Sequence, residues 1–563
     1  MNDYRPDAAD AAFVLFDVLQ AHETLAQLPG FADNADPDLL RQVLDEAGKF
    51  VGQVVAPLNR IGDETGARHA NGAVTMPPGF RDAYQAFWRA GWPALSHAPE
   101  HGGQGLPTVL EMVLYEWLSA ANHGWTMAPG LLHGAVECIR QHGSPELREH
   151  YLEKVTTGEW LATMCLTEPH AGSDLGLVRT KAVPMPDGRY ALSGTKIFIS
   201  GGEHDLSDNI VHLVLARLPD AVPGPKGLSL FLVPKFYADG LRSAVACERI
   251  EEKMGLHGSP TCVMRFDDAP GWLVGEPGKG LNAMFVMMNA ARLHVALQGV
   301  GLLDAAWQKA DAYARERRQM RAPGPRDPSQ PADFIIRHAA VQRLLDTQRA
   351  WIDAGRVLAY RTAVELDVAR CHPDPARRRR AGDWCAVATP VLKAAWTDQA
   401  FHGASDCLQV FGGHGYVREW GIEQVVRDSR VAMIYEGTNE IQAQDLLFRK
   451  VLADEERGLQ GLLLDLDTDL DGSESAAALR ATTGLAQLRD LLHALHAAGP
   501  AARENLHAVA GDFLRVVALT LMGWAWFRLD RADAPGNGAA AFERWVWPEL
   551  SMRHGMVRQA LAA

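Results

Sequence analysis

Residues 434–443, IYEGTNEIQA, combine one ionisable side chain near the start of the segment, Glu436, with a glycine directly after it. A carboxylate can act as a general base toward a weakly acidic C–H bond when apolar neighbours raise its pKa toward the working pH. Met433 and Ile434 supply such neighbours, and Gly437 leaves the main chain open to a ligand. The same residues are compatible with a glutamate at a helix start, where the helix dipole favours negative charge. Glu436 is therefore a candidate catalytic base, with a structural glutamate as the alternative.

The chain around this segment divides by pattern into helical and extended regions. In residues 38–160 and 281–454, apolar side chains recur every three or four positions, which is typical of amphipathic helices. In residues 161–280, short stretches of alternating or β-branched residues are separated by Gly, Pro and Asp, which predicts strands. A helical extension, residues 1–37, precedes them, and an acidic linker with further helices, residues 455–563, follows. We expect an α+β multidomain protein with separate helical and β domains rather than a doubly wound sheet.

The size and composition are those of a large globular protein. A chain of 563 residues exceeds what one hydrophobic core supports and suggests roughly three or four structural units. Hydrophobic residues make up 47% of the chain and charged residues 22%, so neither a disordered nor a fibrous protein is indicated. The 55 basic and 69 acidic residues give a net charge of −14, which argues against nucleic acid as a partner.

Cysteine usage and the N-terminal sequence indicate the compartment. The seven cysteines form no CxxC pair and no Cys/His ligand spacing, so we predict neither a disulfide framework nor a metal site. The acidic N-terminus lacks the basic region and cleavage site of a secretory signal. The longest apolar runs, such as residues 516–527, are shorter than the roughly 20 residues that a bilayer helix needs. We therefore expect a cytoplasmic protein without a membrane span.

Five segments occur in the order and at the spacing of one enzyme family. They are MCLTEPHAGSD (164–174), GTKIFISGG (194–202), EEKMGLHGSPTC with GEPGKGL (251–281), YARERRQM (313–320), and QVFGGHGY (409–416) with the motif around Glu436. Together they resemble the acyl-CoA dehydrogenase family of flavoproteins. The resemblance implies an N-terminal helical domain, a middle β-domain and a C-terminal four-helix bundle. The extra C-terminal helical extension is similar to that of the longer subgroup that includes 3-methylmercaptopropionyl-CoA dehydrogenase.

The resemblance implies FAD as the cofactor and identifies the residues that hold it. Amides and hydroxyls of the first segment would contact the flavin ring and the pyrophosphate, and Phe198 and Ser200 would lie against the isoalloxazine. Arg317, Gln409 and the paired glycines would reach the flavin of a neighbouring subunit. The implied cofactor residues are Met164, Leu166, Thr167, Gly172, Ser173, Phe198, Ser200, Arg317, Gln409, Gly412, Gly413, Thr438 and Glu440. Four of the segments also have a purely structural interpretation. It is a Pro/Gly turn for residues 164–174 and a core aromatic residue for Phe198. It is a solvated basic helix face for residues 313–320 and a C-cap turn for residues 409–416.

The resemblance also bears on which residue is the base. Some branches of the family carry the catalytic glutamate on an earlier helix, immediately before an arginine. In this chain the residue before Arg292 is Ala291, which cannot accept a proton, and the acid occurs at Glu436. The resemblance therefore assigns the base to Glu436. The residues implied to lie beside the substrate are Ser173, Asn289, Arg292, Tyr435 and Gly437. Arg292 is also compatible with a salt bridge within its helix.

The implied reaction is α,β-dehydrogenation of an acyl-CoA thioester to trans-2-enoyl-CoA. Glu436 would take the α-proton while the β-hydrogen leaves as hydride to the flavin. A flavin ribityl hydroxyl and the backbone N–H of Glu436 would stabilise the enolate oxygen, at roughly 3 kcal/mol for each donor. A medium- or long-chain fatty acyl-CoA ranks first as the substrate, and 3-methylmercaptopropionyl-CoA ranks second.

Family members pass their electrons to electron-transferring flavoprotein and build the flavin site from two chains. The resemblance therefore implies that electron acceptor and a homodimer or larger assembly. Two alternatives stay open, an acyl-CoA oxidase that passes electrons to oxygen and a non-catalytic flavin- or acyl-CoA-binding module. Release of hydrogen peroxide in air would indicate the oxidase. The binding module predicts no bleaching of the flavin band when acyl-CoA is added anaerobically, and the intact Glu436 counts against it.

Overall fold

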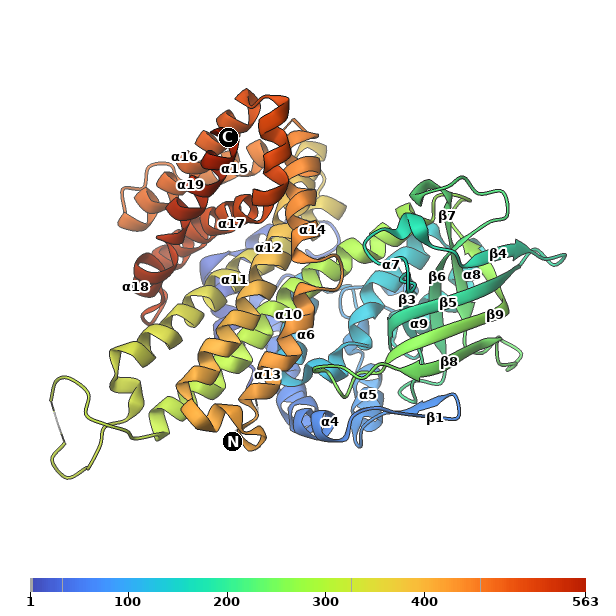
Figure 1. The fold of residues 1–563 in the computed structure, drawn as a ribbon, viewed down its shortest axis with the longest axis horizontal. Coiled ribbons are helices and arrows are strands. Elements are labelled where there is room, and N and C mark those ends of the chain that lie inside the picture. Colours follow the sequence, from blue (N-terminus) through green and yellow to red (C-terminus); the bar gives the residue numbers. More distant parts are fainter. Residues whose placement is uncertain (1–3, 33, 326, 456, 563) are drawn as a thin grey trace. The chain divides into compact units, whose positions relative to one another are not determined.

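The computed structural model describes residues 4–32, 34–325, 327–455 and 457–562, and the chain forms two compact units (Figure 1). The first, which we call the bundle unit, comprises Met1–Lys49, Pro107–Ala120 and Val295–Ala563. The second, the sheet unit, comprises Phe50–Leu106 and Ala121–His294. Segments far apart in the sequence therefore belong to the same compact body. The domain boundaries at residues 37, 160, 280 and 454 stay predictions.

The sheet unit is built around a seven-stranded sheet. Its strands are β3 Leu161–Cys165, β4 Lys181–Pro184, β5 Tyr190–Ser200, β6 Ile210–Arg217, β7 Leu228–Pro234, β8 Val245–Ile250 and β9 Thr261–Val274. The strand order is β3-β6-β4-β5-β9-β7, and β8 pairs with β9. Strand β6 also pairs with β7, the last strand in this order. Strands β6 and β7 are buried along almost their whole length, which explains their continuous apolar sequences.

Helices and a small hairpin accompany this sheet. The hairpin strands β1 Arg68–Ala70 and β2 Ala73–Thr75 are joined by Asn71 and Gly72, both with positive φ, as a two-residue hairpin turn requires. The helices of the unit are α4 Asn59–Thr65, α5 Phe80–Arg89, α7 Leu132–His142, α8 Pro145–Leu147 and α9 Glu153–Thr156. Two longer helices have residues in both units, α6 Thr108–Thr126 and α10 Gly280–Glu316.

The regular elements among the described residues of the bundle unit are helices. Its elements are α1 Ala8–Ala12, α2 Ala21–Leu25, most of α3 Pro37–Phe50, α11 Ala339–Cys371, α12 Pro375–Val410, α13 Ile422–Ser429, α14 Asn439–Gln444, α15 Arg457–Leu470, α16 Ala476–Ala497, α17 Pro500–Arg531, α18 Gly538–Ala541 and α19 Glu549–Ala562. Indole pairs mark its core. The rings of Trp351 and Trp396 join α11 to α12 at 5.2 Å between centroids, and those of Trp384 and Trp524 join α12 to α17 at 6.0 Å. The C-terminal extension therefore shares its core with the bundle.

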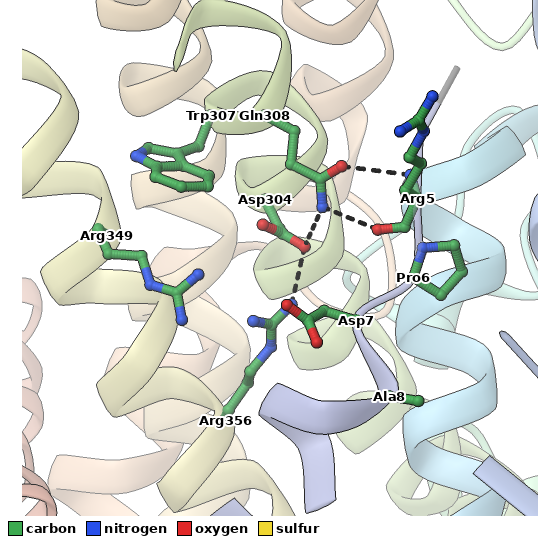
Figure 2. Close-up of a pocket in the computed structure, with 9 residues that line it drawn as sticks. All are labelled: Arg5, Pro6, Asp7, Ala8, Asp304, Trp307, Gln308, Arg349 and Arg356. Carbon is green, nitrogen blue, oxygen red and sulfur yellow. Dashed lines mark hydrogen bonds and ion pairs between the residues drawn. The ribbon is translucent and has the colours of Figure 1, made fainter. Parts of the chain in front are cut away.

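The N-terminal segment docks on the same unit through polar contacts (Figure 2). The side chain of Gln308 on α10 bonds the backbone N–H and carbonyl of Arg5, and the hydroxyl of Tyr4 donates to Asp304. Arg356 on α11 is buried and donates to Asp304 and Asp10. These contacts surround a pocket of about 310 Å³. Polar and charged side chains thus contribute to the attachment of residues 4–10.

The α+β class is confirmed, because the strands of the large sheet lie between Leu161 and Val274 and long helices follow them. The hairpin of β1 and β2 lies in the region predicted to be helical, where the sequence analysis missed it. The proline-rich segment RAPGPRDPSQPADF, residues 321–334, falls between the end of α10 at Glu316 and the start of α11 at Ala339. The apolar run at 516–527 lies within a longer stretch of α17, Glu504–Arg531, whose length and mean hydropathy of 1.4 would suffice to cross a bilayer. In its most apolar window, 72% of the residues are buried inside the protein, as in the core helix of a soluble domain.

Candidate active site

The loop that carries Glu436 lies in the bundle unit, between a short 3₁₀-helix, Arg430–Met433, and α14. Thr438 is the N-cap of α14 and accepts a hydrogen bond from the N–H of Ile441 at 3.3 Å. The acidic residue in the first turn of the helix is Glu440, whereas Glu436 precedes the N-cap by two positions. The helix-start interpretation of Glu436 is therefore wrong. The residue that benefits from the helix dipole is Glu440.

Glu436 has an unusual backbone conformation. Its φ is 54°, and that of Gly437 is 82°, so two consecutive residues are left-handed. This conformation costs roughly 1–2 kcal/mol for a residue with a Cβ and is retained only where surrounding contacts enforce it. The side chain is half-buried, so it is neither sealed in the core nor fully solvated. Strained, partly accessible residues of this kind cluster at functional sites.

The neighbours of Glu436 only partly match the sequence prediction. Tyr435 is half-buried, and its hydroxyl donates to Gln298 of α10 at 2.6 Å. Burial, and then the charge of Glu436, raise the pKa of the Tyr435 phenol, so this side chain stays neutral. Ile434, expected to shield the carboxylate, is 50% exposed. Its apolar surface is available to a ligand instead.

In the sheet unit, the predicted flavin loop begins at the end of β3. Met164, Leu166 and Thr167 are half-buried, whereas Gly172 and Ser173 are exposed. The backbones of Glu168 and Ala171 bond each other in both directions, which closes a tight turn. The sequence-based interpretation of this segment as a turn is therefore confirmed for its backbone. It leaves the residues that follow accessible to a ligand.

Phe198 lies on a bulge of the neighbouring strand. The register between β5 and β9 shifts between Lys196 and Ile199, and Phe198 within this shift has a φ of 59°. Its side chain is 60% exposed, so the interpretation as a core aromatic residue is wrong. Ser200, two positions further on, is half-buried. An exposed ring on a strained bulge is suited to stacking against a flat ligand.

A buried ion pair that sequence reasoning missed connects the two segments. The ammonium of Lys196, which has no exposed side-chain surface, lies 2.8 Å from a carboxylate oxygen of Glu168 and donates to the carbonyl of Leu166. Burial alone would raise the pKa of Glu168, but Lys196 and hydrogen bonds from Thr180 hold it below its usual value. The sequence offers no signal for this pair, since a lysine in a strand of mixed exposure reads equally as a solvated side chain.

The residues expected to reach a neighbouring flavin come together in the bundle unit. Tyr313, one turn before Arg317, stacks on Phe411 with 4.3 Å between ring centroids. Arg317 is exposed directly after the end of α10, and Gln409, Gly412 and Gly413 are exposed around the end of α12. A Cβ placed on either glycine would meet nothing within 4 Å. The structure thus supplies an accessible cation beside accessible backbone.

The remaining predicted residues are less informative. Arg292 is half-buried on α10. The side chain of Asn289 lies outside the described residues, and its backbone belongs to the same helix. Glu440 is exposed, and the side chain of Thr438 caps α14 as described above.

Family models, related sequences and solved structures similar to this chain belong to one family. Family models match as acyl-CoA dehydrogenase N-terminal domain at residues 38–159, middle domain at 163–269 and C-terminal domain at 278–450. A 3-methylmercaptopropionyl-CoA dehydrogenase from Ruegeria pomeroyi is 43% identical over 526 residues, covering 90% of this chain and 89% of that protein. A butyryl-CoA dehydrogenase from Syntrophomonas wolfei is 36% identical, covering 80% and 76%. An acyl-CoA dehydrogenase structure from Bacillus anthracis, complexed with FAD, aligns with a TM-score of 0.77 at 21% identity, covering 95% and 90%.

The chain belongs to the acyl-CoA dehydrogenase family, and it is an oxidoreductase of that class. FAD is the cofactor of this family, and the described residues fit it. The exposed ring of Phe198 offers a stacking surface. Open space beside the backbone of Gly172, Gly412 and Gly413 would admit a phosphate chain without displacing side chains.

Proposed function

We propose that this protein removes the α- and β-hydrogens of an acyl-CoA thioester to give trans-2-enoyl-CoA, with Glu436 as the catalytic base. The observation that carries the proposal is the left-handed, half-buried position of Glu436 ahead of the α14 N-cap. Glu436 precedes α14, whose N-cap is Thr438 and whose first-turn acidic residue is Glu440. A catalytic role for the carboxylate would explain why the strained conformation is retained.

The chain supplies both the base and part of the oxyanion site. A free carboxylate is too weak to remove an α-proton beside a thioester unless the developing enolate oxygen is stabilised. The backbone N–H of Glu436 is the chain's proposed donor to that oxygen, while its carboxylate takes the α-proton. The proposed substrate contacts are Tyr435 and Gly437 in the bundle unit, and Ser173, Asn289 and Arg292 in the sheet unit. Bound FAD supplies the acceptor for the hydride that leaves the β-carbon.

The proposed cofactor contacts fall into two groups. In the sheet unit, the loop at Met164–Ser173 and the bulge at Phe198 and Ser200 would hold the flavin ring and pyrophosphate. In the bundle unit, Arg317, Gln409 and the glycine pair would serve the flavin of a second copy. The residues of the first group are Met164, Leu166, Thr167, Gly172, Ser173, Phe198 and Ser200, and those of the second are Arg317, Gln409, Gly412 and Gly413. Thr438 and Glu440 are proposed to border the flavin.

Two substrate classes compete. The sequence-based ranking places medium- or long-chain fatty acyl-CoAs first. The 43% identity to the Ruegeria pomeroyi enzyme, over most of both chains, favours 3-methylmercaptopropionyl-CoA as the second candidate. Anaerobic titration with acyl-CoAs of graded length and with the methylmercapto substrate, followed by flavin absorbance, would rank them. The acyl-CoA that bleaches the flavin band at the lowest concentration identifies the substrate class.

The proposed setting is a cytoplasmic homodimer or larger assembly that passes electrons to electron-transferring flavoprotein. The exposed Arg317 and Gly412–Gly413 backbone support the assembly, because an accessible site of this kind suits a ligand held by another copy. Stoichiometric peroxide release in air, with no transfer to the flavoprotein, would instead indicate an acyl-CoA oxidase. Light scattering of the purified holoenzyme measures the assembly.

The variant Glu436→Gln tests the base directly. It keeps the size and hydrogen-bonding capacity of the side chain but removes the proton acceptor. We expect unchanged FAD content and a roughly 100- to 10,000-fold slower bleaching of the flavin band by acyl-CoA under anaerobic conditions. The control Glu419→Gln changes an exposed glutamate elsewhere in the bundle unit and should match the wild type. Bleaching of Glu436→Gln at more than a tenth of the wild-type rate would reject this base.

A further inference from the structure

Two buried side chains donate hydrogen bonds to the backbone of the loop that carries Glu436. The carbonyl of Glu436 accepts a hydrogen bond from the side chain of Gln442 at 3.0 Å. The carbonyl of the next residue, Gly437, accepts one from the ammonium of Lys393 at 2.8 Å. Lys393, on α12, and Gln442, on α14, each have 0% of their surface exposed. The two peptide groups that follow Glu436 are therefore fixed by donors inside the protein.

Lys393 also holds the residue that starts the next helix. Its ammonium lies 3.0 Å from the side-chain oxygen of Asn439, the first residue of α14. The hydroxyl of Thr397 donates to the same oxygen at 3.1 Å, and the amide nitrogen of Asn439 donates to the carbonyl of Ala394 at 3.1 Å. One buried cation on α12 thus connects Gly437, before the N-cap, to Asn439, after it.

We propose that Lys393 is a positioning residue for the reaction, which holds the Glu436–Gly437 backbone so that the carboxylate and the N–H of Glu436 face the substrate together. The inference rests on the proposed role of Glu436 as the base. Two successive left-handed residues are not held by local preference, because Glu436 carries a Cβ. The donors of Lys393 and Gln442 fix the torsion angles after Glu436, and those angles direct its side chain.

A lysine at this buried position is unexpected on grounds of stability alone. Moving an ammonium out of water costs several kcal/mol unless hydrogen bonds and nearby charge compensate. A methionine of similar length would fill the same space between apolar neighbours without that cost. An ammonium at this position has two functional explanations. It is a strong hydrogen-bond donor to the Gly437 carbonyl. Its positive charge would also favour the ionised form of the Glu436 carboxylate in the same loop.

The experiment compares three substitutions of the FAD-loaded enzyme. Lys393→Met removes both the donor and the charge, and Lys393→Gln removes the charge but keeps a shorter donor. The matched control is Gln399→Leu, which removes another buried polar group from α12. Its hydrogen bond goes to Gln348 on α11 and not to the loop. For each variant, FAD content, thermal midpoint, KM, kcat and the pH profile of kcat are measured.

We expect kcat of Lys393→Met to fall roughly 10- to 100-fold, with FAD content and KM within twofold of the wild type. Lys393→Gln should fall between Lys393→Met and the wild type. The apparent pKa of the base in the kcat profile should rise in Lys393→Met relative to Gln399→Leu, because a nearby positive charge has been removed. Asp428 and Tyr435 also lie near the loop, so the profile is compared between variants. A merely structural lysine would lower the thermal midpoint without moving this profile.

Wild-type kcat and an unshifted profile in Lys393→Met would overturn the inference, and so would an equal loss of kcat in Gln399→Leu. If Lys393→Met does not fold, Asn439→Ala, which removes one acceptor of the ammonium at the helix start, takes its place. Its kcat should fall with FAD content and KM within twofold of the wild type, whereas the pH profile should not move, because the positive charge stays. The two proposals fail separately. An active Glu436→Gln contradicts the base, whereas an inactive Glu436→Gln with a fully active Lys393→Met contradicts only the positioning role.

Discussion

At the scale of single residues, two predicted site residues share one conformational signature. Glu436 and Phe198 both have positive φ, at 54° and 59°, although neither is a glycine. Neither is buried in the core, since Glu436 is half-buried and Phe198 is 60% exposed. Other residues with a Cβ, such as Met320 and Asp268, share a positive φ and an exposed position. The signature therefore supports the proposed base and the proposed stacking ring only together with the family motifs that carry them.

Gly437→Ala tests how tightly the base depends on its backbone. The glycine has a φ of 82°, and an added Cβ would lie 2.7 Å from the side-chain nitrogen of Gln442. We expect a loss of about 1 kcal/mol from the left-handed conformation alone and a kcat lowered roughly tenfold or more. Chemical denaturation and steady-state kinetics measure the two effects. The comparison variant is Gly461→Ala, on helix α15 with open space around it, which should leave kcat unchanged and stabilise slightly.

At the scale of elements, the proposed flavin-binding loop after β3 is anchored by contacts with strand β5. The N–H of Ile197 donates to the carbonyl of Thr167 at 2.9 Å, and the Lys196–Glu168 pair lies directly beneath. A bulge exposes the ring of Phe198, while the residue two positions earlier is fully buried. The same strand therefore exposes the ring of Phe198 and anchors the loop after β3.

Lys196→Met should weaken FAD binding more than it weakens the fold elsewhere. It leaves the carboxylate of Glu168 buried without its cation, which costs on the order of 3–5 kcal/mol locally. We expect the dissociation constant of FAD to rise roughly tenfold or more. The comparison variant is Lys235→Met, which removes a partner of Glu203 in the same unit while Arg242 continues to pair with it. Equal FAD affinity in the two variants, measured by flavin fluorescence, would contradict the role of the Lys196 pair.

At the scale of the whole molecule, the bundle unit gathers both ends of the chain around one charged cluster. Asp10 of the N-terminal segment pairs with Arg349 and Arg356 of α11, and Arg528 of α17 donates to the carbonyl of Val18. These contacts join residues more than 300 positions apart. The extension at each end is therefore part of the packed body.

This cluster makes stability depend on pH. Burial raises the pKa of Asp353 to about 6, although Arg349 lies 2.7 Å away. Its folded pKa exceeds its unfolded value, so its contribution to stability is complete below about pH 4 and is lost as the pH rises through 6. We expect Asp353→Asn to gain stability relative to the wild type as the pH is raised from 4 to 8. Each unit of pKa shift corresponds to about 1.4 kcal/mol.

Thermal midpoints of the FAD-loaded wild type and variant, recorded at several pH values, measure this difference. Asp471→Asn, which changes an exposed carboxylate in the same unit, controls for the loss of one charge. A difference between Asp353→Asn and the wild type that stays constant from pH 4 to pH 8 would contradict the assignment.

The sequence alone determined the order of helices and strands, the family and the position of the candidate base, because periodicity and short motifs are local. It misjudged the surroundings of that base. Glu436 could be placed in a helix start, and Phe198 in a core, only while their backbone angles and exposure were unknown. The structure alone revealed Lys393 beneath Gly437, 44 positions away in the sequence, and Lys196 beside Glu168, 28 positions away. Such contacts depend on which elements pack together, and no local pattern encodes the geometry of a buried hydrogen bond between distant segments.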